Sequence, residues 1–290
     1  FVNFISKRLT KRWVRSHQVN QSGTRVGVRA RFFKKMVNPL WTFDRKRTKS
    51  SMGVVGVDEA GRGCLAGPVV AGAVLLPASF FKSAANRRAC VNINDSKQVK
   101  EVLREELFEL IQELGEKNEL FWASGEASVE EIEAENIVGA TCLAMGRAME
   151  QVAIQSNGLW KPKAKTEDNL FNFKLETENN WIVSVDGRFM KRLPFQHEGM
   201  IKGDTLSLAI AMGSLVAKVT RDRRMKELDG EFPLYDFSSN KGYGSPKHLS
   251  ALESIGPSIH HRPRFLRKII CSPKEEDGKI VDLQSQLSFS

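Results

Sequence analysis

Short apolar segments alternate with long stretches of helical periodicity between residues 53 and 228, and this alternation constrains the fold more than any other feature. Segments of the first kind predict buried strands, and the stretches between them predict helices that pack on a sheet. The pattern predicts strands at 53–57, 69–76, 121–127, 181–185 and 199–202, and helices at 96–114, 128–154 and 205–228. We therefore expect one α/β domain over residues 51–270.

Composition excludes several classes of protein. Hydrophobic residues make up 41% of the chain and charged residues 27%, which excludes wholesale disorder. No window approaches about 18 consecutive apolar residues, so we expect no membrane-spanning helix. No two of the cysteines have CxxC spacing, which argues against a disulfide framework or a thiolate zinc site and fits a reducing interior.

The excess positive charge lies almost entirely in residues 1–50, which hold 14 Lys and Arg residues and a single acid, Asp44. The rest of the chain is close to neutral, so binding of nucleic acid by the domain has to rest on local patches. We treat residues 1–50 as a separate basic extension with three open interpretations: a transit peptide for mitochondria or plastids, a basic arm that tethers nucleic acid, or a disordered tail. Without an import signal, a nuclear or cytoplasmic location is expected. The sequence begins at Phe1 rather than at a methionine, which leaves the start of the natural chain open.

Two further segments are expected to lie outside the core. Residues 155–180 are polar and rich in Lys and Asn, which predicts a surface insertion. Residues 271–290 have the composition of a disordered tail.

Acidic residues stand at the ends of the expected strands. Asp58 and Glu59 end the first strand, Asp186 ends the fourth, and Asp204 follows the fifth. Because open α/β sheets bind ligands just beyond their strand ends, these segments could bring their carboxylates to one place. Such a cluster is unfavourable unless a cation compensates it, and all-oxygen ligands favour Mg²⁺ or Mn²⁺ over zinc. Each acid taken alone has a plainer interpretation as a solubilising loop residue.

The geometry of a strand limits what Asp58 and Glu59 can do together. Adjacent residues point to opposite faces, so either the chain bends here or Glu59 engages partly through its backbone. The loop Gly61-Arg62-Gly63 follows at once and would permit such a bend. Its exposed N–H groups and the Arg62 side chain could contact a phosphate or sugar, although a simple turn is the default interpretation.

Two acids near the last helix need separate interpretations. Asp204 stands at the expected N-cap of that helix, where its plain role would be a cap. Asp222 lies about 27 Å further along a continuous helix, so it cannot share a site with Asp204. We interpret Asp222 as a structural partner of a neighbouring base, Arg221 or Arg223.

Other loop residues are candidates for substrate binding. Tyr243 stands between two glycines and could stack on a sugar or offer its hydroxyl. Ser96 and Lys97 stand at a helix start, where N–H groups and a lysine can hold a phosphate, although a plain cap is the alternative. Packing or surface roles are expected for three histidines: His248, His260 and His261.

Several blocks of this sequence, in order and spacing, resemble the ribonuclease HII family. The blocks are GVDEAGRGCLAGPVVAGAVLL (56–76), NDSK (94–97), SVEEIEAENI (128–137), VDG (185–187), KGDTLSLAIAMGSLVAKVTRD (202–222) and KGYGSPKHL (241–249). The resemblance covers about residues 53–270, and DEAGRG and KGYG are its most specific blocks. The sequence departs from the family pattern in three places: the long 155–180 segment, Met212-Gly213, where small alanines are commoner, and the basic extension.

The resemblance implies a ribonuclease H-like fold, with a central five-stranded mixed sheet and a helical C-terminal region. It implies a metal-dependent endonuclease that cleaves RNA in RNA–DNA hybrids and incises at single ribonucleotides in duplex DNA, acting as a monomer without a membrane partner. By motif position, the metal-site acids are Asp58, Glu59, Asp186 and Asp204. The implied substrate-binding residues are Gly61, Arg62, Gly63, Ser96, Lys97, Lys202 and Tyr243, of which the GRG loop reads the ribose 2′-hydroxyl and Tyr243 contacts the RNA–DNA junction.

Phosphodiester chemistry then suggests a mechanism. Two divalent ions about 4 Å apart would activate a water and stabilise the leaving 3′-oxygen, which leaves 3′-hydroxyl and 5′-phosphate ends. Two alternatives stay open: a non-catalytic nucleic-acid-binding subunit with the same fold, and an aspartyl-phosphate phosphotransferase. Against the phosphotransferase, the sequence lacks the DxD spacing expected around such a nucleophile.

Overall fold

The computed structural model describes residues 37–94, 100–165, 180–270, 275–276 and 279–280. Contacts between Cα atoms divide the chain into residues 1–36 and residues 37–290, and the description below concerns the second unit. Within the predicted C-terminal tail, the described residues form two short antiparallel strands, β6 (Glu275–Glu276) and β7 (Lys279–Ile280). The rest of that tail lies outside the described residues.

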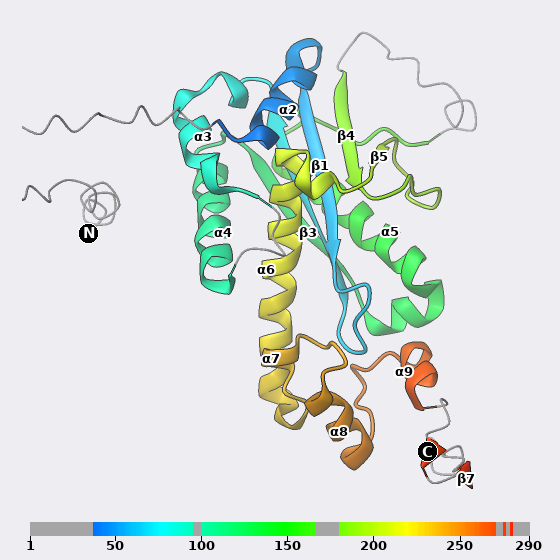
Figure 1. Ribbon diagram of the computed structural model, residues 1–290. Helices are drawn as coiled ribbons and strands as arrows, with labels where there is room; N and C mark the ends of the chain where they lie inside the picture. The colour runs from blue at the N-terminus through cyan, green and yellow to red at the C-terminus, as the bar shows by residue number, and fades with distance from the viewer. Residues whose placement is uncertain (1–36, 95–99, 166–179, 271–274, 277–278, 281–290) are drawn as a thin grey trace, which may run out of the picture. The chain divides into compact units, whose positions relative to one another are not determined.

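A five-stranded mixed sheet forms the centre of the domain (Figure 1). Its strands, in spatial order, are β3 (Phe121–Ala127), β2 (Val69–Pro77), β1 (Gly53–Ala60), β4 (Trp181–Asp186) and β5 (Glu198–Met200). β2 pairs antiparallel with both β3 and β1, whereas β4 pairs parallel to β1 and β5 parallel to β4. The predicted α/β fold with a five-stranded sheet is confirmed.

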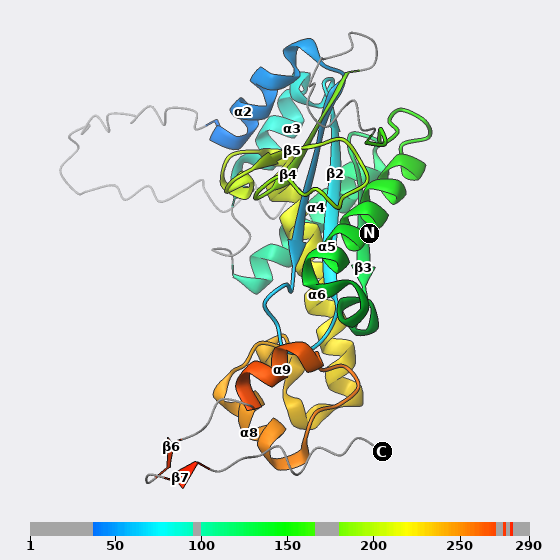
Figure 2. The same ribbon diagram turned by 90° about the vertical axis from the view of Figure 1, so that its right-hand side faces the viewer.

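Two long helices, α6 (Leu208–Glu231) and α5 (Val129–Gln155), cover opposite faces of this sheet (Figures 1 and 2). Alternate residues of β1 divide between them, because Val54 packs in the core with α6 while Val55 and Val57 pack with α5. A Cβ atom at Gly56 would lie 2.1 Å from the backbone of Ala209, so α6 crosses β1 in direct backbone contact. The start of α6 is therefore fixed beside the end of β1.

The remaining helices complete the α6 layer and its surroundings. α3 (Ala84–Ala89) and α4 (Glu101–Glu116) lie between β2 and β3 in the chain, and α4 buries Leu107, Ile111 and Leu114 in the α6-side core. α5 begins at the predicted capping box, in which Ser128 and Glu131 bond each other's backbone N–H groups. Within the described part of the chain, α5 alone is long and apolar enough to span a bilayer, but 56% of that stretch is buried inside the protein.

The chain is already folded before residue 51, which corrects the boundary drawn from the sequence. Residues Pro39–Arg47 form helix α2, whose Leu40 and Trp41 side chains are buried in the α6-side core. Asn38 caps this helix and donates hydrogen bonds to the carbonyls of Cys90 and Ile93, both at 2.8 Å. Residues 37–50 therefore belong to the domain. The sequence pattern missed α2 because the helix is short and strongly basic, and because its contacts are with segments distant in the chain.

The cap of α6 also differs from the prediction. Ser207, not Asp204, is the N-cap residue, and its hydroxyl accepts from the N–H of Ile210. The Ser207 hydroxyl donates to Oδ2 of Asp44 at 2.9 Å, and the N–H of Ala209 donates to the same atom at 3.0 Å. The single acid of the basic segment thus binds the N-terminus of α6, where the helix dipole favours a negative charge.

Part of the predicted surface insertion packs against the body. Trp160 is 4% exposed and lies in the α5-side core, and Ala164 forms an isolated bridge with Phe195. Residues 166–179 of that segment lie outside the described residues.

Short helices gather at the C-terminal end of α6, as Figures 1 and 2 show: α7 (Phe237–Asn240), α8 (Pro246–Ile255) and α9 (Pro263–Ile270). They form a small core of their own with Met225 and Leu228 of α6 and with Leu65 and Ala66 of the β1–β2 loop. The C-terminal helices therefore hold the loop that follows the end of β1.

Candidate active site

Three carboxylates converge on the α6 face of the sheet. The parallel register of β1 and β4 sets Val57 beside Val185, so the next residues, Asp58 and Asp186, project side by side on the same face. Asp204 joins them from the turn after β5. One oxygen atom from each of the three lies within 4.8 Å of the other two.

The turn that carries Asp204 is bonded directly to Asp186. Lys202 adopts a left-handed conformation with φ of 56°, and residues Gly203–Thr205 form a short 3-10 helix. The N–H of Gly203 donates to Oδ1 of Asp186 at 2.6 Å. Asp204 is 5% exposed, so it is a buried member of the cluster rather than a helix cap.

Asp58 is buried among other negative charges. Burial, followed by the charges of Glu59 and Asp186, raises the pKa of Asp58 well above its ordinary value. Its Oδ1 accepts from the N–H of Glu59 at 2.7 Å, whereas its Oδ2 is buried without a hydrogen-bond partner among the described residues. Because the cluster is all oxygen and contains one such atom, its donor set fits a hard divalent cation. Asp58, Asp186 and Asp204 are the residues that would hold it.

Glu59 is not brought into this cluster. The pairing of β1 continues through Glu59 and Ala60 without a bend, so the Glu59 side chain points to the α5 face. There Oε1 accepts from Nη1 of Arg62 at 2.9 Å. Two possibilities were predicted for Glu59: a bend in the chain, or engagement through its backbone. Because the strand pairing is regular and shows no bend, engagement through the backbone remains.

The loop after β1 has the backbone that its glycines predict. Gly61 has φ of +91°, a conformation that favours glycine, and a Cβ atom there would lie 2.0 Å from Nε of Arg221. Gly63 is exposed, and a Cβ atom there would meet nothing within 4 Å. The Arg62 side chain is also exposed, at 47%. Arg62 and Gly63 therefore face solvent, whereas Gly61 packs against Arg221 of α6.

The structure brings the KGYG segment against this loop. The N–H groups of Leu65 and Ala66 donate to the carbonyl of Gly242 at 2.8 and 3.3 Å. Tyr243 is 49% exposed, and burial, followed by the neighbouring Cys64 thiol, raises its pKa. The GRG loop and Tyr243, 180 residues apart in the chain, thus form one surface beyond the end of β1.

Other predicted site residues have different outcomes. Lys202 is exposed two residues before Asp204, and its carbonyl accepts from the N–H of Thr205 at 3.0 Å. Ser96 and Lys97 lie outside the described residues. Asp222 is not part of the cluster, and α6 is continuous as expected. Its partners are Lys218 at 2.6 Å and Arg104 at 3.7 Å, and not the adjacent arginines.

Two of the histidines contact each other, and one of them contacts the main chain of Tyr243. His248 Nδ1 lies 2.8 Å from the Tyr243 carbonyl, and its Nε2 lies 2.9 Å from Nε2 of His261. His261 Nδ1 accepts from the N–H of Ser258 at 2.9 Å. Burial, and then the neighbouring His248, lowers the pKa of His261 to about 4, so the pair is neutral at physiological pH. These histidines therefore have the packing role expected for them.

Sequence reasoning missed three buried residues around the site: Asp44, Arg221 and Arg262. Only Asp44 carried a signal, because it is the single acid in a basic segment. The two arginines gave none, since a buried guanidinium bonded to carbonyls looks like any other arginine in a sequence.

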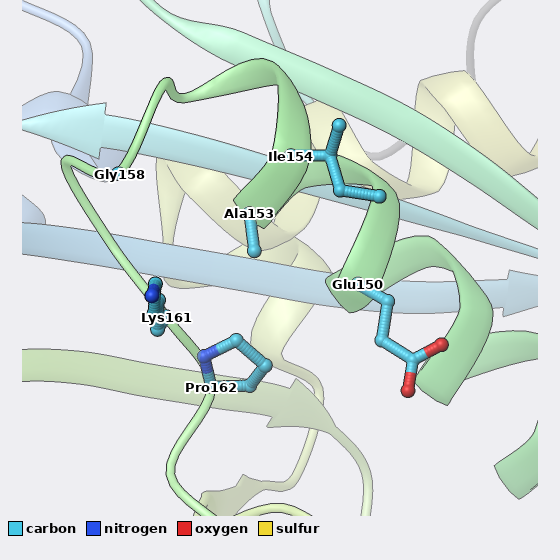
Figure 3. Close-up of a pocket in the computed structure, with 6 residues that line it drawn as sticks. All are labelled: Glu150, Ala153, Ile154, Gly158, Lys161 and Pro162. Carbon is cyan, nitrogen blue, oxygen red and sulfur yellow. The ribbon is translucent and has the colours of Figure 1, made fainter.

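A shallow hollow lies elsewhere, against the end of α5 (Figure 3). It is lined by Glu150, Ala153, Ile154, Gly158, Lys161 and Pro162, none of which belongs to the carboxylate cluster or to the two loops.

Comparisons with known proteins identify the family of this chain. A family model described as Ribonuclease HII matches residues 55–268. The ribonuclease HII of Burkholderia thailandensis is 39% identical over 212 residues, which is 73% of this chain and 82% of that protein, and the ribonuclease HII of Burkholderia pseudomallei is 40% identical over the same length.

Solved structures show the same fold at lower identity. Ribonuclease H2 from Pyrococcus horikoshii OT3 aligns with a TM-score of 0.53 and 22% identity, over 75% of this chain and 97% of that one. Bst-RNase HIII in complex with Mn²⁺ aligns with a TM-score of 0.55 and 14% identity, over 80% and 73%. The chain therefore belongs to the ribonuclease HII family, and it is a divalent-metal-dependent ribonuclease H endonuclease that acts on RNA–DNA hybrids.

Proposed function

We propose that this endonuclease also incises duplex DNA at single embedded ribonucleotides, and that it leaves 3′-hydroxyl and 5′-phosphate ends. The observation that carries the proposal is the junction of two features at the end of β1. A carboxylate triad suited to phosphoryl chemistry, with Asp58 and Asp204 buried and Asp186 half-buried, stands next to an exposed glycine loop that is bonded to the Tyr243 segment. The carboxylate triad can act on any phosphodiester, whereas the glycine loop with Tyr243 can recognise a single sugar.

The chain's own residues divide the work. Asp58, Asp186 and Asp204 would hold the metal, with Glu59 contributing through its backbone. Bound divalent ions, two Mg²⁺ or Mn²⁺, would supply an activated water and a counter-charge for the leaving oxygen. The bond from Gly203 to Asp186 keeps the Asp204 turn in place, and the exposed Lys202 is available to a neighbouring phosphate.

Selectivity belongs to the loops, because the phosphates of RNA and DNA are identical. Only the 2′-hydroxyl separates the two sugars, and it is both a donor and an acceptor. Backbone groups of Gly61, Arg62 and Gly63 can reach it without reading a base, and the Tyr243 ring and hydroxyl stand beside them. Ser96 and Lys97 are proposed to hold a phosphate further along the strand.

Cleavage of three matched duplexes tests the proposal: one with a single ribonucleotide, one with a continuous RNA strand, and one of DNA only. With Mg²⁺ or Mn²⁺ we expect cleavage of the first two, and a new 5′-phosphate that a phosphatase removes. Asp186→Asn is the matched inactive control, with activity lower by roughly 100-fold or more at unchanged duplex affinity. Binding without cleavage by the wild type would instead support a non-catalytic subunit, and a wild-type-like rate for Asp186→Asn would refute the metal site.

We also propose that the basic N-terminal segment is an import signal for mitochondria or plastids. The ten Lys and Arg residues of positions 1–36, with no acid among them, support this. A fluorescent protein fused behind residues 1–36 should enter one of these organelles. A diffuse or nuclear signal would contradict import and favour a basic arm.

A further inference from the structure

Two arginines are completely buried beneath the GRG loop. Arg221 comes from α6 and Arg262 from the segment before α9, and their exposed fractions are 1% and 0%. Neither forms an ion pair with any residue that the structure describes. Burying an arginine without a carboxylate partner is unfavourable, so their position needs an explanation.

Among the described residues, every hydrogen bond of these guanidinium groups goes to a main-chain carbonyl, either in the loop between β1 and β2 or at the start of the KGYG segment. Arg262 donates to the carbonyls of Gly67, at 2.7 and 2.9 Å, and Pro68, at 3.0 Å, and its Nη1 donates to the carbonyl of Arg62 at 3.1 Å. Arg221 donates to the carbonyls of Pro68 at 3.0 Å, Ala66 at 3.2 Å and Lys241 at 2.9 Å. The arginines thus clamp the GRG loop to the start of the KGYG segment.

The bond to Arg62 fixes the orientation of one peptide group. In a planar trans peptide the N–H points away from the carbonyl, so the N–H of Gly63 points away from the buried Arg262. Among the described residues this N–H has no acceptor, and the space beside Gly63 is open. An N–H held in this way is a donor that is already oriented before the substrate binds.

We propose that Arg262 is a positioning residue for sugar discrimination. By holding the Arg62 carbonyl inward it aims the Gly63 N–H at the 2′-oxygen of the substrate, while Arg221 keeps the Tyr243 segment against the same loop. The inference rests on the proposed reading of the 2′-hydroxyl by this loop. A deoxyribose offers no acceptor at that place, so only the ribonucleotide gains the bond.

Arg262→Lys tests this role, because lysine keeps the charge but cannot bridge three carbonyls with a planar fork. Binding of a duplex with one ribonucleotide and of an all-DNA duplex is compared by fluorescence anisotropy, in an Asp186→Asn background that prevents cleavage. We expect Arg262→Lys to lose about 5- to 150-fold of the preference for the ribonucleotide and to leave affinity for DNA within about twofold. Arg223→Lys, an exposed arginine on α6 that pairs with Glu105, is the matched control and should change neither value.

Each outcome is decisive. If Arg262→Lys keeps the full preference while circular dichroism shows a native fold, the positioning role is wrong. If the wild-type loops show no preference for the ribonucleotide, the proposed function fails and the inference fails with it. Should Arg262→Lys not fold, the Gly63 amide is followed by ¹⁵N NMR in the Asp186→Asn protein. Hydrogen-exchange protection by the ribonucleotide duplex alone supports the inference, and equal or absent protection by both duplexes refutes it.

Discussion

Oδ2 of Asp58 is a buried carboxylate oxygen with no hydrogen-bond partner among the described residues, beside two further acids. Such an atom is unfavourable in a folded protein, and a bound cation would remove the penalty. The metal should therefore stabilise the fold as well as serve the reaction.

We expect Mg²⁺ to raise the unfolding midpoint by roughly 5–10 °C at a concentration about 100-fold above its dissociation constant. Scanning calorimetry with Mg²⁺ and with EDTA measures this. The shift should disappear in Asp186→Asn, which loses one ligand charge. An equal shift in both proteins would mean that the cation binds elsewhere.

The two glycines of the GRG loop should respond differently to alanine. Gly61→Ala places a methyl group in a left-handed conformation and against Arg221, so we expect a loss of about 1–3 kcal/mol of stability together with activity. Gly63→Ala has open space, so its stability should change by less than about 0.5 kcal/mol. Its methyl group would nevertheless obstruct the approach of a sugar, and cleavage at a single ribonucleotide should fall.

Urea unfolding and cleavage kinetics on both variants separate the two effects. A Gly61→Ala protein as stable as the wild type would contradict the close contact with Arg221. Unchanged cleavage by Gly63→Ala would argue against backbone contact with the substrate at that residue.

At the scale of elements, α2 joins the metal site to the rest of the domain. Asp44 binds the start of α6, Ser207 donates its N–H to the carbonyl of Gly203, and Gly203 in turn bonds Asp186. Arg47 of the same helix donates to Ser184 of β4 at 3.1 Å and pairs with Glu198 of β5. This helix therefore braces both segments that carry Asp186 and Asp204.

Asp44 should give the protein a distinctive pH dependence. Burial, opposed chiefly by the hydrogen bonds from Ala209 and Ser207, raises its pKa from 3.8 to about 6. Because the folded state then binds the proton more tightly than the unfolded state, the contribution of Asp44 to stability decreases as pH rises from about 4 to about 6. Asp44→Asn keeps an oxygen for both donors and cannot ionise.

The stability of the wild type relative to Asp44→Asn should thus fall by up to about 3 kcal/mol between pH 4 and pH 7. Urea unfolding of both proteins across this range provides the measurement, and subtraction removes the titration of all other groups. A constant difference would mean that Asp44 titrates at its ordinary pKa.

The elements that could be predicted are those whose information is local. The strand positions follow from runs such as VVAGAVLL, and they place Asp58 and Asp186 at strand ends. The parallel register that sets these two acids side by side joins strands far apart in the chain. The start of α6 could not be predicted, because Asp204 and Ser207 are both acceptable caps and the choice depends on Asp44 from a distant helix. Strand geometry predicts that the Glu59 side chain points to the face opposite Asp58, but it does not predict the ion pair of Glu59 with Arg62.

At the scale of the whole molecule, the division between residues 36 and 37 falls inside the basic segment, and residues 37–50 belong to the second unit. Deletion of residues 1–36 should leave cleavage within about twofold and stability unchanged, because every described contact of α2 remains. Deletion of residues 1–47 removes Asn38, Asp44 and Arg47 and should destabilise the protein severely. Thermal unfolding and single-ribonucleotide cleavage of both truncations provide the measurement, and equal behaviour of the two would contradict the bracing role of α2.

The contacts that complete the site can form only late in the synthesis of the chain. Asp44 and Ser207 are 163 positions apart, and Arg62 and Arg262 are 200 apart. Contacts of such separation close long loops and are expected to form late in folding. On the ribosome, the α6 cap cannot form before residue 207 emerges, and the clamp on the GRG loop cannot form before residue 262 does. A nascent chain therefore carries the acids of β1 long before the contacts that complete the site can form.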